Sequence, residues 1–288
     1  MKDRPMIRPR FLVVIPAYNE EARIGPVLRD FATRLRAQYR GPFRVMVVLN
    51  GCRDRTEDVV RLAATEFAEV EPLIFHEPIG KGGALIEGFK QARDAEIVAY
   101  VDADGATGPD ALMQLVDELR NDDCVIGSRW LPGAVLHRSQ TRLRRIMSRS
   151  FHTIVEAFFW MGIKDTQCPA KVLRRAALDK VIHSLRIADL AFDVNLLVAL
   201  HRAGCTVREV PIEWTDQAGS KVTASLWRSS LVMFLSVLRL RLIYSPLHRI
   251  LRLFRPLETW LYLRLHAPPP RPVVADSRKT SPVPDRTS

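Results

Sequence analysis

The chain has 288 residues, of which 47% are hydrophobic, so it can bury a substantial core in one large domain or two small ones. Its four cysteines lie far apart without a C-x-x-C pair, which argues against a zinc knuckle or a disulfide framework and is typical of a reducing cytoplasm. The net charge of +11 is concentrated after residue 220, where 12 Lys and Arg stand against 3 Asp and Glu, and this asymmetry indicates an anionic partner, either nucleic acid or a membrane surface.

Apolar runs alternate with segments of helical periodicity in the first half of the chain. Such wholly apolar strands, linked by single helices, predict a mainly parallel α/β sheet covered on both faces. Thr56 is a plausible N-cap for the second helix, and Pro109 suits the first position of the fourth. The predicted strands cover 11–18, 43–51, 71–78, 95–104 and 123–129, and the predicted helices cover 20–38, 56–67, 82–94 and 108–120.

The second half of the chain has a different pattern. Residues 136–163 begin basic and end apolar, 188–204 form a clear helix closed by Gly204, and 206–214 indicate a strand. Two basic amphipathic segments follow up to residue 266, and the proline-rich tail from 267 to 288 is expected to be disordered. We expect neither a signal peptide nor a membrane-spanning helix, because the apolar runs are too short.

Two aspartates, Asp102 and Asp104, come directly after the fourth predicted strand. Ligands of such sheets gather at the carboxyl ends of the strands. A turn after the strand would let both carboxylates approach one Mg²⁺ or Mn²⁺, which prefers hard oxygen ligands and also binds substrate phosphates. A solvated turn or a helix-capping role remains an open alternative for this pair.

Two other strand ends carry candidate residues. The stretch "GKGGA" places Lys81 among glycines, yet it matches neither a P-loop nor a dinucleotide fingerprint, so a phosphate nest and a tight turn are both open. The stretch "IPAYNEE" supplies an aromatic ring, an amide and two acids, which also fit a loop followed by a helix N-terminus.

Taken together, several motifs resemble the family 2 glycosyltransferases, and within them the dolichyl-phosphate β-glucosyltransferases. The likeness runs in order from about Phe11 to Tyr244, and "DADGAT", "DTQC", "AFDV" and the final tryptophan-to-lysine motif are specific to that branch. The motifs are "VVIPAYNEE", "LNGCRDRTEDV", "GKGGALIEGF", "VDADGAT", "IGSR", "GIKDTQCPAKVLRR", "LAFDVNLL" and "PIEWTDQAGSK".

The resemblance implies an inverting, metal-dependent transferase with the A-type glycosyltransferase fold. It implies Asp102 and Asp104 as metal ligands, and Asp104, Arg129 and Asp193 as catalytic residues. The alternative for Asp193 is a structural role as a salt-bridged or capping acid. Asp165 has the same two possible roles, functional or structural. The residues expected to bind the sugar nucleotide are Pro16, Ala17, Tyr18, Glu20, Asn50, Asp54, Lys81, Asp102, Ala103, Asp104 and Lys221.

The chain departs from the family in the second loop, where the usual "DDGS" is replaced by "LNGC". Asn50 offers a donor as well as acceptors where a carboxylate only accepts, which leaves the base of the donor open. Ala106 stands where mannosyl relatives often have glutamine, and this favours the glucosyl branch.

An acceptor in a membrane would explain the basic C-terminal part. A lipid phosphate is already an anionic nucleophile, so positioning should matter more than a strong general base. Arg129, Arg144 and Arg145 are candidates to hold this phosphate, with a solvated helix face as the alternative for Arg144 and Arg145. Arginines mixed with Leu, Phe and Trp suit an interface better than a nucleic acid, for which no recognised module is present.

The sequence therefore predicts a catalytic domain over 1–221, with a nucleotide-sugar half at about 11–130 and an acceptor half at about 131–221. Membrane-interface helices are expected over 222–266. The expected reaction is transfer of glucose from UDP-glucose to a polyprenyl phosphate, at the cytoplasmic face of a membrane with which the protein associates peripherally. The alternatives are GDP-mannose as donor, a soluble acceptor, or a non-catalytic sugar-nucleotide-binding protein.

Overall fold

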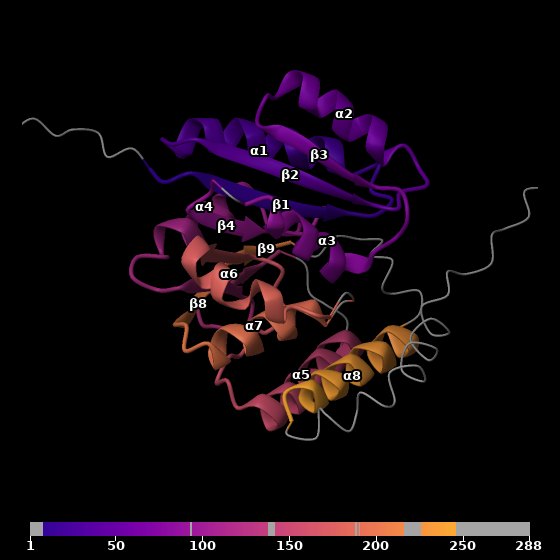
Figure 1. Ribbon diagram of the computed structural model, residues 1–288, viewed down its shortest axis with the longest axis vertical. Coiled ribbons are helices and arrows are strands. Elements are labelled where there is room, and N and C mark those ends of the chain that lie inside the picture. The colour runs from indigo at the N-terminus through magenta and orange to yellow at the C-terminus, as the bar shows by residue number, and fades with distance from the viewer. Residues whose placement is uncertain are drawn as a thin grey trace, which may run out of the picture. The chain divides into compact units, whose positions relative to one another are not determined.

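A seven-stranded sheet has the strand order β3-β2-β1-β4-β7-β5-β8. Figure 1 shows β3, β2, β1 and β4 one beside the next. The computed structural model describes residues 8–92, 94–137, 142–187, 189, 191–215 and 226–245, with the backbone alone for 142–146 and 226–230. The strands are β1 (Phe11–Ala17), β2 (Phe43–Asn50), β3 (Val70–Phe75), β4 (Ile97–Tyr100), β5 (Cys124–Ser128), β7 (Lys171–Arg174) and β8 (Val207–Pro211).

All strand pairs of this sheet are parallel except those of β7, which runs antiparallel between β4 and β5. The mainly parallel α/β sheet predicted from the sequence is therefore confirmed. The four residues of β7 are too few to give a clear apolar run, which is why the sequence pattern does not predict this strand. A short parallel pair, β6 (Val135–Leu136) and β9 (Glu213–Trp214), forms a second sheet.

Helices cover both faces of the large sheet. Side chains alternate between the faces along each strand, so the wholly apolar strands present apolar side chains on both faces. Val13 and Ile15 of β1 pack in the core under α1, α2 and α4, while Leu12 and Val14 pack in the core under α3, α6 and α7. The helices of the first face are α1 (Ile24–Gln38), α2 (Thr56–Glu66) and α4 (Pro109–Asp117), and those of the second are α3 (Gly80–Lys90), α6 (Arg175–Val181) and α7 (Phe192–Arg202).

Two element boundaries differ from the sequence-based expectation. Strand β4 ends at Tyr100 instead of continuing to residue 104, so Asp102 and Asp104 both lie in the turn that follows it. Thr56 is the first helical residue of α2 and not its N-cap, which is Arg55. The carboxylate of Asp54 accepts the backbone N–H of Thr56 at 3.0 Å, and this contact takes over the capping role that we expected of Thr56.

A third apolar cluster joins α7 to two long helices, α5 (Arg142–Phe159) and α8 (Leu226–Ile243), which lie side by side in Figure 1. Val155 of α5 and Val237 and Leu240 of α8 are buried in it. The described part of the expected membrane-interface segment 222–266 thus packs against α5 and α7 in this third cluster. In the part of the chain that the structure describes, no helix is both long and apolar enough to cross a membrane.

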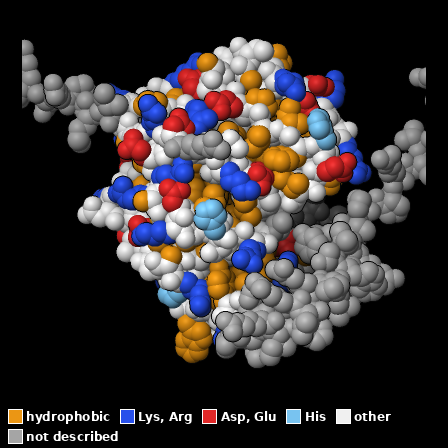
Figure 2. Space-filling model, in the orientation of Figure 1, with side chains coloured by type: hydrophobic (Ala, Val, Ile, Leu, Met, Phe, Trp, Pro, Cys, Tyr) orange, Lys and Arg blue, Asp and Glu red, His pale blue; other side chains and the backbone are white. Residues whose placement is uncertain are grey.

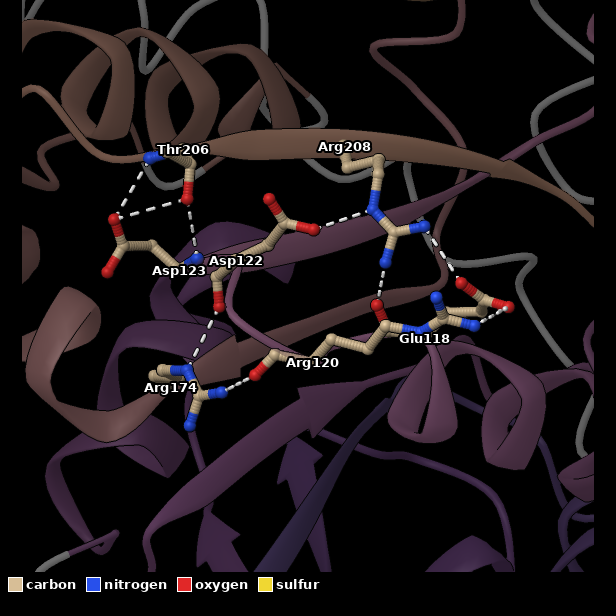
Figure 3. Close-up of polar contacts among 7 residues, drawn as sticks. All are labelled: Glu118, Arg120, Asp122, Asp123, Arg174, Thr206 and Arg208. Atoms are coloured by element: carbon tan, nitrogen blue, oxygen red, sulfur yellow. Dashed lines mark hydrogen bonds and ion pairs between the residues drawn. The ribbon is translucent and has the colours of Figure 1, made fainter.

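Charges of both signs are intermixed on the face shown in Figure 2, as the nearly balanced composition before residue 221 implies. One group of charges holds together the end of the sheet where β5 and β8 begin (Figure 3). The guanidinium of Arg208 donates to Asp122 at 2.6 Å, to the carboxylate of Glu118 at 2.8 Å and to the carbonyl of Glu118. Arg174 donates to the carbonyls of Asp122 and Arg120.

We expect Arg208→Leu to lower the free energy of unfolding more than the loss of a simple surface pair does, because Asp122 and the carbonyl of Glu118 lose this donor and the carboxylate of Glu118 keeps only its ion pair with Arg120. Arg61→Leu is the matched control, since Arg61 forms an exposed pair with Glu57 within one helix. Urea unfolding monitored by circular dichroism measures both. Equal losses in the two variants would contradict a structural role for this group of charges.

Candidate active site

The loops that follow β1 and β2 are joined by hydrogen bonds at the carboxyl end of the sheet. The backbone N–H of Glu20 donates to the hydroxyl of Thr56 at 2.7 Å, and the N–H of Glu21 donates to Asp54 at 3.3 Å. The carboxylate of Glu20 forms an ion pair with Arg23. Pro16, Ala17 and the exposed Tyr18 belong to the same edge, at the end of β1. The expected nucleotide-binding residues of these two loops therefore lie together.

Asn50 ends β2 and is buried. Its side-chain oxygen accepts the backbone N–H of Ile79 at 2.7 Å, which ties the end of β2 to the N-terminus of α3. The next residue, Gly51, has φ of +65°, and a Cβ at this position would lie 2.6 Å from the backbone nitrogen of Pro78. Only glycine fits this close approach. Asn50 and Gly51 thus help to fix the turn after β2.

Asp102, Ala103 and Asp104 form a turn after β4, and Gly105 continues it with φ of +73°. Asp104 accepts the backbone N–H of Ala106 at 3.0 Å, while Ala103 is buried in the core. Burial raises the pKa of Asp102, and the neighbouring Asp104 carboxylate adds to this, although Lys81 opposes it. Both carboxylates lie beyond the end of β4. The alternation of side-chain direction along a strand therefore does not place them on opposite faces of the sheet.

Lys81 lies in the first turn of α3 and contacts two aspartates. Its Nζ is 2.7 Å from Oδ1 of Asp102 and 3.7 Å from Oδ2 of Asp193. Burial alone would lower the pKa of Lys81, but these two carboxylates hold it above its ordinary value. The ammonium and the N-terminus of α3 contribute positive charge at an edge that also carries Asp102 and Asp104, and both positive groups suit a diphosphate.

Asp193, in the first turn of α7, lies in a buried polar cluster. Its Oδ1 accepts the ammonium of Lys171 at 2.6 Å and the hydroxyl of Tyr100. The same ammonium donates to the carbonyl of Cys168 at 2.6 Å, and the side chain of Lys171 is 0% exposed. Burial alone would raise the pKa of Asp193, but Lys171 and Lys81 hold it below its ordinary value. Asp193 is therefore ionised and ion-paired.

Arg129 follows β5 and is held by Asp165 from "DTQC". Its Nε and Nη2 donate to the two oxygens of Asp165 at 2.8 and 2.9 Å, and its backbone N–H adds a third bond at 2.9 Å. The guanidinium carbon lies 5.2 Å from the ring centroid of Trp214. Burial would raise the pKa of Asp165, yet Arg129 holds it below its usual value. The arginine is fixed in place at the strand end.

The comparison with known proteins decides the family. The model of "Glycosyl transferase family 2" matches residues 12–182. The chain belongs to this family. The curated relatives include the dolichyl-phosphate β-glucosyltransferases of Drosophila melanogaster, 34% identical over 77% of this chain and 72% of the relative, and of Homo sapiens, 32% identical over 73% and 68%. The resemblance inferred from the motifs is thus confirmed, and this protein is a glycosyltransferase.

Solved structures agree with the A-type fold expected of a family 2 transferase. Glucosyl-3-phosphoglycerate synthase from Mycobacterium tuberculosis, in complex with Mn²⁺, UDP-glucose and phosphoglyceric acid, aligns with a TM-score of 0.62 at 17% identity, over 83% of this chain and 81% of that one. The same protein has also been solved with Mg²⁺ and UDP, at a TM-score of 0.63. At this identity the likeness establishes the fold alone.

The residues of this transferase fit a divalent cation that is shared with a substrate. Mg²⁺ is commonly bound through one or two carboxylates plus substrate phosphates, and Asp102 and Asp104 supply such a pair in one turn. Within the described residues, no group of three or more His, Cys, Asp or Glu could hold a metal by itself. A pair of carboxylates suits a metal that a substrate diphosphate also coordinates.

Three expected site residues of the transferase carry no side-chain observation. Lys221 lies outside the described residues, and Arg144 and Arg145 lie in the first turn of α5, where only the backbone is described. Their assigned roles stay predictions. Conversely, sequence reasoning missed Lys171 and Tyr100, which contact Asp193. The available signal was Asp193 itself, because an acid in an apolar helix requires a buried cation and donors.

Proposed function

We propose that this transferase moves glucose from UDP-glucose to a polyprenyl phosphate at the cytoplasmic face of a membrane. The observation that carries the proposal is the group of curated relatives, from the fly, human and yeast proteins among others, that are named dolichyl-phosphate β-glucosyltransferase and match most of this chain at 30–34% identity. The solved neighbour complexed with UDP-glucose and Mn²⁺ supports the donor and the metal.

The site chemistry fits an acceptor that is already an anion. A cation held by Asp102 and Asp104 would offset the charge that develops on the leaving nucleoside diphosphate. In this proposal Lys81, which contacts Asp102, and the N-terminus of α3 bind the same diphosphate. A strong general base is unnecessary for a phosphate nucleophile, and Asp193 is a poor base, because Lys171 and Lys81 hold its pKa low. Asp193 therefore fits a positioning role.

A panel of donors and acceptors tests the proposal. The full chain is incubated with labelled UDP-glucose, UDP-galactose, GDP-glucose or GDP-mannose, together with Mg²⁺ or Mn²⁺ and either a polyprenyl phosphate or 3-phosphoglycerate. We expect label in the organic phase from UDP-glucose alone. Transfer only to 3-phosphoglycerate, the kind of acceptor bound by the solved neighbour, would overturn the lipid acceptor, and transfer from GDP-mannose alone would overturn the donor.

Membrane association needs a test that leaves the core intact, because Val237 and Leu240 of α8 are buried against α5 and α7. Trp160, just after α5, is 79% exposed, and Leu231 of α8 is 50% exposed. Tryptophan at the surface suits a membrane interface. We expect Trp160→Ser with Leu231→Ser to reduce flotation with anionic liposomes severalfold, whereas Leu62→Ser on α2, 62% exposed, leaves it unchanged. Equal flotation of all variants would contradict a role of these two side chains in membrane binding.

A further inference from the structure

Charged groups of alternating sign form a continuous chain from the core to the carboxyl end of β4. Lys171 contacts Asp193, Asp193 faces Lys81, and Lys81 contacts Asp102. Exposure rises along the chain, from 0% for the side chain of Lys171 to 32% for that of Asp102. The inner end is therefore fixed by packing, and the outer end meets solvent.

The outermost pair occupies one of the two carboxylates that are expected to bind the metal. An ammonium 2.7 Å from Oδ1 of Asp102 repels a divalent cation that approaches the same carboxylate. A second acceptor lies within reach of this ammonium, since Oδ2 of Asp193 is 3.7 Å away. Asp193 is in turn held by Lys171 and by the hydroxyl of Tyr100, so it cannot follow Lys81 outward.

We propose that Lys81 takes the place of the metal at Asp102 in the donor-free enzyme, and that Asp193 is the positioning residue that receives it when the metal binds. Lys171 and Tyr100 keep Asp193 in position for this exchange. A donor diphosphate would also attract the released ammonium, so metal and donor bind well together and the metal alone binds poorly. This inference rests on the proposed donor site and adds to it a reason for the coupling of the two ligands.

Binding of Mn²⁺ to the full chain without nucleotide tests the exchange, measured from the free Mn²⁺ signal in electron paramagnetic resonance. We expect Lys81→Met to bind Mn²⁺ roughly tenfold more tightly than the wild type, because the competing ammonium is gone. Lys81→Arg, which keeps the charge, should stay near the wild type. Lys90→Met is the matched control, since Lys90 pairs with Glu87 on the exposed last turn of the same helix. Unchanged or weaker binding in a folded Lys81→Met would overturn the proposal.

The same variant should bind the sugar nucleotide more weakly while it binds Mn²⁺ more tightly. We expect the KM for UDP-glucose to rise in Lys81→Met, and a general loss of structure would not move the two affinities in opposite directions. If no sugar nucleotide is turned over but the Mn²⁺ results hold, the proposed function fails and the exchange stands. If glucose is transferred but the Mn²⁺ affinity of Lys81→Met is unchanged, the exchange fails and the proposed function stands.

A crystal structure of the wild type with Mn²⁺ and no nucleotide keeps the test independent of any variant. We expect Nζ of Lys81 to leave Asp102 and to lie about 2.8 Å from Oδ2 of Asp193, an ordinary distance for a charged hydrogen bond. Mn²⁺ bound by both aspartates with Lys81 still on Asp102 would refute the exchange.

Discussion

Replacing Asp193 by alanine should lower the free energy of unfolding by about 3–5 kcal/mol, the range for breaking a buried ion pair by removal of one partner. The reason is the ammonium of Lys171, whose side chain is 0% exposed and would lose its only contacting carboxylate among the described residues. Urea unfolding at pH 7, with the slope of the transition compared between variants, measures the change. Asp193→Leu combined with Lys171→Met should recover most of the loss, because it removes both charges.

Asp179→Ala provides the matched control, because Asp179 forms an exposed pair with Arg175 one helical turn away. Its loss should stay within about 0.5 kcal/mol. A similarly small loss in Asp193→Ala would show that the buried cluster contributes little.

The stabilisation by Asp193 should depend on pH in a defined direction, because the folded-state pKa of Asp193 is below its ordinary value of 3.8. The difference between wild type and Asp193→Ala should therefore be complete above about pH 4 and shrink as the pH falls through the lower, folded-state pKa.

If Asp104 binds the metal as proposed, Asp104→Asn should reduce the kcat of glucosyl transfer by roughly a thousandfold or more, because it would remove a charged ligand of that metal. Asparagine is preferable to alanine here. Its side-chain oxygen can still accept the N–H of Ala106, which the Asp104 carboxylate accepts at 3.0 Å, so the turn after β4 keeps its hydrogen bond. Initial rates with UDP-glucose, polyprenyl phosphate and Mg²⁺ measure the effect.

The control for this measurement is Asp110→Asn, a change of the same kind in the first turn of the neighbouring helix α4. Asp110 is exposed and faces Arg34 and Gln38, away from the strand ends. Its rate should remain within about twofold of the wild type, as for a surface substitution. If Asp104→Asn keeps more than a tenth of the activity at saturating Mg²⁺, the role of this aspartate as a metal ligand is wrong.

Much of the fold follows from the pattern of apolar residues. Continuous runs such as that of β1 predict strands buried on both faces, and Pro109 marks the start of α4 as expected. The antiparallel β7 was beyond this reasoning, because its four residues are too few to give a clear apolar run. The packing of α8 was also beyond it, because the buried Val237 and Leu240 look like any apolar residues of an amphipathic segment.

For the candidate site, the sequence indicates some of the residues but not the contacts between them. Spacing identifies Asp102, Asp104 and Lys81, because each follows a strand or opens a helix at the same edge of a parallel sheet. It does not show that Lys81 contacts Asp102, nor that Asp165 fixes Arg129, since these partners come from different loops. A lysine with 0% exposure is also unexpected from its neighbours in sequence, because lysine is almost never fully buried without a partner.

The register of β7 has a consequence for how this enzyme can change over evolution. Lys171 lies directly opposite Tyr100 in the antiparallel pair, and so both side chains leave the sheet on the same face. A shift of one residue would send Lys171 to the opposite face and leave Asp193 facing an apolar side chain. An insertion or deletion that shifted this register would therefore separate Lys171 from Asp193. The length of the segment before β7 therefore constrains the chemistry, as does Asp165 within that segment, which fixes Arg129.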